Sequence, residues 1–160
     1  MRTFFFSIAA ACGLALATLS TGLAHDGMTR AGDIEITHVW ARAMLPNQPA
    51  GAGYLYVTNT GSEPDSLVGA SSPAAGRVEI HAMQVINDVM TMRPVEGGLE
   101  IAADTTVKLE PGGLHVMFMD VAEPFKDGDH LQVTLEFERA GNVDVTFPVR
   151  KAHGGGHGDH

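Results

Sequence analysis

Cysteine is scarce: Cys12 is the only one in the 160-residue sequence. It lies in residues 1–24, where one arginine is followed by an uncharged apolar run and then by small residues. This order is typical of a secretory signal peptide. We expect cleavage after Ala24, so that His25 begins the mature chain, with an earlier cut after Ala17 as the alternative. Lipid attachment at Cys12 is disfavoured, because only alanines precede it where a branched apolar residue is usual.

Removal of the signal peptide leaves no cysteine at all, and this absence limits the chemistry of the mature chain. Neither a disulfide nor a thiolate ligand is available. A blue-copper electron carrier needs a thiolate ligand, so that class is excluded. Any metal site must be built from imidazole, thioether or oxygen ligands.

Basic residues are also few, with 10 Lys and Arg against 19 Asp and Glu. The formal net charge of −9 becomes −10 when residues 1–24 are removed, because Arg2 is the only charged residue among them. Such an acidic chain is a poor binder of nucleic acids and anionic lipids. A cationic ligand or partner fits better.

Beyond residue 24 the sequence lacks both a long apolar run and a helical repeat. No segment approaches the roughly 20 apolar residues that cross a bilayer, so we expect a soluble, periplasmic protein. Short alternating runs separated by Gly, Pro, Asn and Asp instead predict strands and turns. The expected strands are residues 34–42, 53–59, 65–70, 77–85, 89–95, 106–110, 114–119, 130–138 and 143–149.

So many short strands with one apolar face must bury that face against each other, and we therefore predict an all-β, Greek-key β-sandwich. The folded domain is expected to span residues 25–150. Residues 151–160, KAHGGGHGDH, are rich in glycine and histidine and are predicted to be a flexible tail.

Two of the expected strands combine histidine with methionine in an unusual way. Period-two alternation groups His115, Met117 and Met119 on one face of LHVMFM, opposite two apolar residues. In RVEIHAMQV it likewise groups His81 with Met83. The methionines therefore lie on the face that ordinary patterning makes polar, and filling gaps in a core does not explain them.

Neutral imidazole nitrogen and thioether sulfur are both metal ligands, and the soft sulfur favours Cu(I) over Zn(II), Mg(II) or Ca(II). The ordinary alternative is that the methionines form a second core or a partner-facing surface and that the histidines are simple polar positions. We favour the copper interpretation because of the spacing of these residues and because the predicted signal peptide directs the chain out of the cytoplasm.

The spacing of these residues resembles that of the PCuAC family of bacterial periplasmic copper chaperones. The family pattern is His, ten residues, Met, twenty-one residues, then His-x-Met. Ten residues separate His81 from Met92, and His115 and Met117 complete the pattern after twenty-two. We expect the extra residue in the turn at 96–98. Trp40 with Arg42 and the segments 51–73, 92–98 and 109–119 also look like the family.

The resemblance implies a cupredoxin-like β-sandwich with His81, Met92, His115 and Met117 as Cu(I) ligands. Met83 would be an accessory methionine. The implied function is delivery of copper to the dinuclear copper site of cytochrome c oxidase, directly or through a thiol-bearing copper chaperone. A copper-sequestering or resistance protein is the alternative, since the ligand set does not reveal the recipient.

The two ends carry further histidines. His153, His157 and His160 in the tail suit Cu(II), as does His25 if its amino group becomes the N-terminus. A solubilising tail is the simpler alternative. We expect no enzymatic activity, although a copper oxidase or monooxygenase built on His25 is the less favoured alternative. His38 is expected to be structural, because it alternates with apolar residues, and His130 to be solvated.

Overall fold

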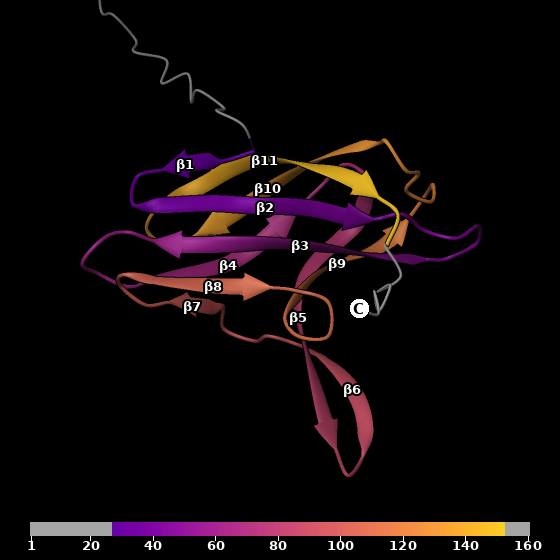
Figure 1. Cartoon of the computed structure of the whole chain (residues 1–160), viewed down its shortest axis with the longest axis horizontal. Coiled ribbons are helices and arrows are strands. Elements are labelled where there is room, and N and C mark those ends of the chain that lie inside the picture. The colour runs from indigo at the N-terminus through magenta and orange to yellow at the C-terminus, as the bar shows by residue number, and fades with distance from the viewer. Residues whose placement is uncertain (1–26, 153–160) are drawn as a thin grey trace, which may run out of the picture.

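The computed structural model describes residues 27–152, so the predicted signal peptide and most of the predicted tail lie outside the described residues. Within this range every regular element is a strand (Figure 1). The strands are β1 (Thr29–Ala31), β2 (Ile34–Arg42), β3 (Ala50–Asn59), β4 (Asp65–Ser71), β5 (Ala75–Ile86), β6 (Val89–Pro94), β7 (Leu99–Ile101), β8 (Thr105–Leu109), β9 (His115–Val121), β10 (His130–Phe137) and β11 (Gly141–Arg150).

All nine strands predicted from the sequence are present, and apart from β2 each differs at one or both ends by one to three residues. The short strands β1 and β7 were not predicted, because three residues are too few to display an alternating pattern. No helix in the described range could cross a membrane.

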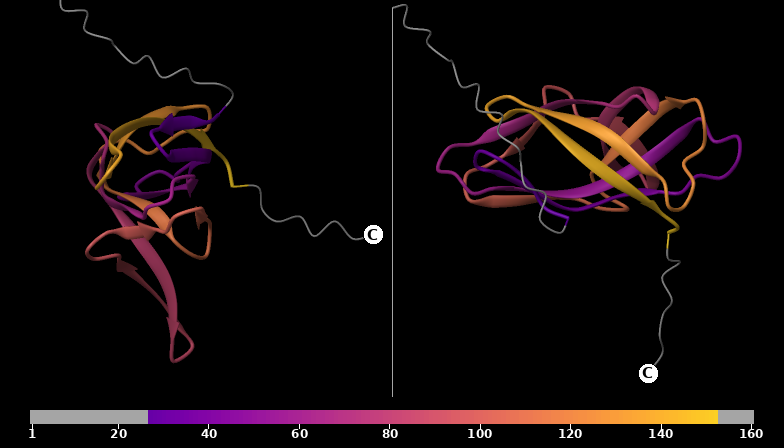
Figure 2. Two further views of the ribbon diagram at one scale, coloured as in Figure 1. Left: turned by 90° about the vertical axis from the view of Figure 1, so that its left-hand side faces the viewer. Right: turned by 90° about the horizontal axis from the view of Figure 1, so that it is seen from above.

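Seven strands form a closed ring of hydrogen-bonded neighbours in the order β2-β11-β10-β4-β5-β9-β3, and β3 then pairs with β2. Neighbours in space are mostly not neighbours in sequence, as in Greek-key folds. The pairing of β11 with β2 is parallel, and the other pairings are antiparallel. Seen end-on and from above, the ring is a flattened sandwich of two strand layers (Figure 2). The predicted all-β sandwich is therefore confirmed.

The core fills the interior of this ring. Phe118 of β9 is fully buried and makes edge-to-face contacts with Phe125 and Phe147, at centroid distances of 5.3 and 6.0 Å. Gly53 of β3 faces this cluster so closely that a Cβ would lie 2.9 Å from the Phe118 ring. The aromatic cluster fixes β9, which carries two of the predicted ligands, against β3.

The β5–β6 hairpin projects away from the sandwich (Figure 1). Its tip is a two-residue turn in which Asn87 and Asp88 both have positive φ, at 52° and 62°. This is the conformation of a type I′ turn, whose twist matches that of the flanking strands. Because β6 pairs only with β5 among the described strands, the hairpin arm leaves much of its side-chain surface open to solvent.

Candidate metal centre

The strand register brings the four residues of the predicted ligand set to one face of neighbouring strands. His81 of β5 lies directly opposite His115 of β9, and Met117 lies opposite Glu79 on the same pair. On the other side of β5, Met92 of β6 lies opposite Met83. Directly paired residues point to the same face of a sheet, and diagonal neighbours are about 7–8 Å apart. His81 is thus flanked by one predicted ligand directly and by two diagonally.

The opposite face of the same strands belongs to the core. Val78 and Ile80 of β5 pair in register with Phe118 and Val116 of β9, and all four are buried. The prediction that the histidines and methionines lie on the non-core face is therefore consistent with the register. The methionines were not needed to fill the interior.

Both histidines are nevertheless buried, with 8% of His81 and 4% of His115 exposed. Their ring centroids are 6.0 Å apart, a separation that one metal ion can bridge with bonds of about 2 Å to each ring. Burial comes from the segments that pack beside them: Val95 N–H donates to the Ile80 carbonyl, and Met83 N–H donates to the Gly113 carbonyl. Simple solvated histidines would not be enclosed in this way.

Each histidine has one ring nitrogen bound to a neighbour and one that is available. His115 Nδ1 donates to the Gly113 carbonyl at 3.0 Å, which leaves the Nε2 lone pair free. His81 Nε2 lies 2.9 Å from the Glu79 carboxylate, and His81 Nδ1 is buried without a hydrogen-bond partner among residues 27–152. Buried polar atoms are normally paired, so this lone pair is available for a metal ion.

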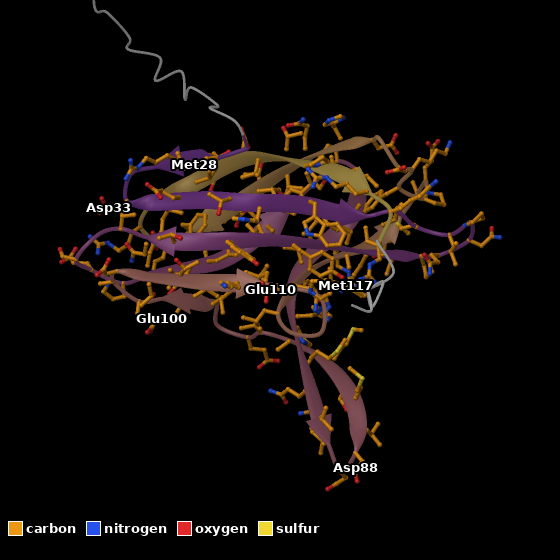
Figure 3. All side chains as sticks on the ribbon, viewed as in Figure 1. Met28, Asp33, Asp88, Glu100, Glu110 and Met117 are labelled. Carbon is orange, nitrogen blue, oxygen red and sulfur yellow. The ribbon has the colours of Figure 1, made fainter. Side chains whose placement is uncertain are left out.

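The sulfur side of the centre is more open than the nitrogen side. Met117 and Met83 are half-buried, whereas Met92 is 49% exposed. Figure 3 shows Met117 close to the point where the β5–β6 arm leaves the sandwich. Among residues 27–152, no group of three or more His, Cys, Asp and Glu side chains is arranged to hold a metal ion. The histidine pair is accompanied by methionine rather than by a cluster of harder ligands.

Large apolar side chains cover the arm beyond this centre. The most exposed ones are Val85, Ile86, Val89, Met90 and Met92. Met90 lies opposite Val85 at the outer end of the hairpin, two positions beyond Met92. Met119 lies on the same face as Met117 but is opposite Arg77, farther from the histidines.

Glu79 is the neighbour of the centre that the sequence reasoning missed. It precedes His81 by two positions, so period two puts both on the same face of β5. That signal was present in the sequence, but a lone Glu-x-His is common and indicates nothing without knowledge of its surroundings. Arg77, a further two positions back, reaches the Glu79 carboxylate at 3.2 Å.

His38 was predicted to alternate with the apolar residues of β2, and this prediction was wrong. The register of β2 shifts between Thr37 and Trp40, and His38 has a φ of 54°. This bulge turns His38 outward, where it is exposed and stacks on Tyr56 at 4.4 Å. His130 is exposed at the start of β10, as expected.

An open groove lies elsewhere on the described surface, beside β2 and β3, and is lined by His38, Trp40, Tyr54 and Tyr56 among others. Tyr56 donates a hydrogen bond to Glu110 at its edge, and this bond raises the pKa of the phenol. The groove contains none of the four residues of the predicted copper site.

Sequence similarity identifies the family to which this chain belongs. The family described as "Putative lipoprotein LpqE-like" matches residues 34–149. The chain belongs to the LpqE-like family. The putative lipoprotein Lxx21020 of Leifsonia xyli is 33% identical over 125 residues, which cover 78% of this chain and 74% of that protein. The uncharacterized protein RP573 of Rickettsia prowazekii is 32% identical over 110 residues, which cover 66% of this chain and 60% of that protein.

This LpqE-like protein is also similar to proteins of known structure. The copper-bound PCuAC domain from PmoF2 superimposes with a TM-score of 0.66 at 29% identity, covering 78% of this chain and 97% of that domain. The solution structure of CuI-DR1885 from Deinococcus radiodurans gives a TM-score of 0.56 at 29% identity, covering 72% and 76%. The resemblance to the PCuAC family and the cupredoxin-like fold are confirmed.

Proposed function

We propose that this protein is an extracytoplasmic copper chaperone that binds Cu(I) through His81, Met92, His115 and Met117. The observation that carries the proposal is the buried histidine pair, in which each ring keeps one nitrogen without a hydrogen-bond partner in the described part of the chain. The similar copper-bound PCuAC domain from PmoF2 and CuI-DR1885 support the metal assignment.

The ligand set explains why the bound ion would be the reduced one. Two imidazoles and two thioethers are neutral, so the site would carry only the single positive charge of Cu(I). Soft sulfur stabilises Cu(I), while the absence of a coordinating thiolate or carboxylate gives Cu(II) less stabilisation. Such a site holds copper without the strong binding that would prevent its release.

The exposure of the ligands supports transfer to a partner. The histidines are almost fully buried, whereas Met92 is 49% exposed on the projecting arm. An acceptor ligand would therefore reach the copper ion from the Met92 side, displacing thioether sulfur before imidazole. The apolar arm around it would lower the cost of bringing a partner surface close. We infer that the acceptor is the dinuclear copper site of cytochrome c oxidase or a thiol-bearing chaperone that serves it.

Transfer of Cu(I) to an acceptor tests delivery against sequestration. Copper-loaded protein is mixed under anaerobic, reducing conditions with the soluble copper-bearing domain of the oxidase in its metal-free form, and both are separated and assayed for copper. We expect most of the copper to move to the acceptor. Retention of copper against this acceptor and against a thiol-bearing chaperone would favour a sequestering protein, and steady consumption of oxygen with a reductant would favour an enzyme.

The tail is proposed as a second site, for Cu(II). Residues 153–160 contain His153, His157, His160 and Asp159, and imidazole with carboxylate suits Cu(II). They lie outside the described residues, so the proposal depends on composition. His25, which also lies outside them, is the alternative Cu(II) ligand.

Truncation after Arg150 tests the tail. We expect the shortened protein to lose one Cu(II) per chain in equilibrium dialysis while it keeps its Cu(I). A His25→Ala variant of the full chain is the matched control and should keep the full Cu(II) stoichiometry. An unchanged Cu(II) stoichiometry in the truncated protein would exclude the tail as a site.

The name of the family and of the Leifsonia xyli relative contains the word lipoprotein, which supports a location outside the cytoplasm. We propose that export uses residues 1–24 and leaves the domain in the periplasm. Cleavage after Ala24 would release it, whereas a lipid on Cys12 would anchor it.

A further inference from the structure

A chain of charged contacts leads from the surface to His81. On β5, Arg77, Glu79 and His81 follow at intervals of two and share the outer face. The Glu79 carboxylate uses both oxygens: Oε1 accepts from Arg77 Nη1 at 3.2 Å, and Oε2 lies 2.9 Å from His81 Nε2. Arg77 Nε also donates to Asp120 of β9 at 3.4 Å. Arg77 therefore holds one oxygen of the Glu79 carboxylate while the other oxygen contacts His81.

These contacts determine which nitrogen of His81 carries the proton. An ionised carboxylate only accepts hydrogen bonds, so Nε2 must be the donor. A neutral imidazole has one N–H, and the lone pair is then on Nδ1, the buried atom that has no partner among the described residues. His115 has the opposite arrangement, because its Nδ1 donates to the Gly113 carbonyl and its Nε2 is free.

We propose that Glu79 is a positioning residue that makes His81 bind copper through Nδ1, while His115 binds through Nε2. This inference rests on the proposed copper site and adds to it the ring nitrogen used by each histidine and the residue that selects it. A carboxylate that accepts from the remote N–H of a ligating histidine fixes the ring and raises its basicity. Glu79 would strengthen the copper bond without becoming a ligand itself.

Arg77 gives the carboxylate its second partner. Glu79 lies opposite Met117 across the β5–β9 pair, close enough to the centre that a free carboxylate could turn toward the metal. Carboxylate oxygen would favour harder ions, including Cu(II). The Arg77 contact keeps one oxygen engaged, and the His81 contact engages the other, so Glu79 stays outside the ligand set.

The test has two readouts, the first of which needs no metal. Long-range ¹H–¹⁵N correlation spectra of the apo protein at a pH where both rings are neutral report which imidazole nitrogen is protonated. We expect the Nε2–H form for His81 and the Nδ1–H form for His115. In Glu79→Ala, His81 should become a mixture of both forms, while His115 is unchanged. In Glu79→Gln, the amide oxygen still accepts a hydrogen bond, so the Nε2–H form should return.

The second readout is Cu(I) affinity, measured by competition with a chromogenic chelator under anaerobic conditions. Glu79→Ala should weaken binding about 10–100-fold, the usual effect of losing such a partner, and Glu79→Gln should recover part of the loss. Glu100→Ala, which removes an exposed carboxylate from β7, is the matched control and should leave the affinity unchanged.

The outcomes separate this inference from the function on which it rests. An Nδ1–H form of His81 in the wild-type apo protein would overturn the role of Glu79, as would wild-type affinity in Glu79→Ala with Cu(I) still bound through nitrogen and sulfur. Failure of the wild-type protein to bind Cu(I) would overturn the proposed function instead, and the spectra of the apo protein would still report the histidine tautomers.

Discussion

Replacing both Met92 and Met117 with alanine should remove sulfur ligation of Cu(I). Cu(I) affinity should fall by more than about 100-fold, the upper end of the loss that is usual when a residue contacting a ligand is removed. The two residues lie on opposite sides of His81, one on β6 and one on β9, so neither can take the place of the other. With two imidazoles left of the four proposed ligands, the preference for soft Cu(I) should also fall.

X-ray absorption of the copper-loaded protein under reducing conditions is the measurement for this variant. The wild-type spectrum should show one Cu(I) with both nitrogen and sulfur scatterers, and the variant should lose the sulfur contribution. The matched control is the Met28→Ala, Met90→Ala double variant, which should keep the wild-type spectrum. Both methionines are exposed and lie outside the proposed ligand set. Absence of sulfur scattering in the wild-type protein would mean that the methionines are surface residues and not ligands.

The Phe118→Ala substitution should cause the second large effect, a loss of about 3–5 kcal/mol in the free energy of unfolding. Phe118 is fully buried and contacts two other aromatic rings across the ring of strands. Truncation leaves a cavity that the surrounding strands cannot fill. Because native domains are stable by only about 5–15 kcal/mol, a large part of the total stability would be lost.

Urea unfolding followed by tryptophan fluorescence measures this change, and Trp40 provides the signal. Val68→Ala removes an exposed side chain from β4 and is the control, with an expected change within about 0.5 kcal/mol. A loss below about 1 kcal/mol for Phe118→Ala would contradict the assignment of this side chain to the core. The variant should also bind Cu(I) less tightly, since Met117 directly precedes Phe118 and His115 lies three residues earlier on the same strand.

The sequence alone predicted the class of the fold because short alternating runs leave few alternatives. Strand β2 has the bounds that its pattern predicted, from Ile34 to Arg42. The alternation failed at His38, where a bulge reverses the face of the side chain, and sequence patterns carry little information on bulges. The three-residue strands β1 and β7 were missed because their formation depends on the partner strand and not on their own residues.

The candidate site, too, was only partly predictable from the sequence. Period two grouped His81 with Met83, and His115 with Met117 and Met119, because it separates the core face of a strand from its other face whatever the strand pairs with. The set of four candidate ligands, which includes Met92, came from the resemblance to the PCuAC family. The sequence could not determine that β5 lies between β6 and β9, and this arrangement is what puts His115, Met92 and Met117 around His81. The turn at 96–98, where we placed the additional residue, is a connection between β6 and β7, and its assignment as the insertion stays a prediction.

What the sequence by itself determined is therefore local: the strands, the apolar face of each and the donor atoms on the other face. What only the tertiary structure decided is the burial of the histidines and the partner of each ring nitrogen. Burial depends on segments distant in sequence, such as Gly113, whose carbonyl accepts a hydrogen bond from Met83 N–H, and a hydrogen bond depends on where a second group comes to lie. The contact between Glu79 and His81 depends on both the sequence pattern and the tertiary structure. The alternation puts the two residues on one face, and the folded strand sets their 2.9 Å separation.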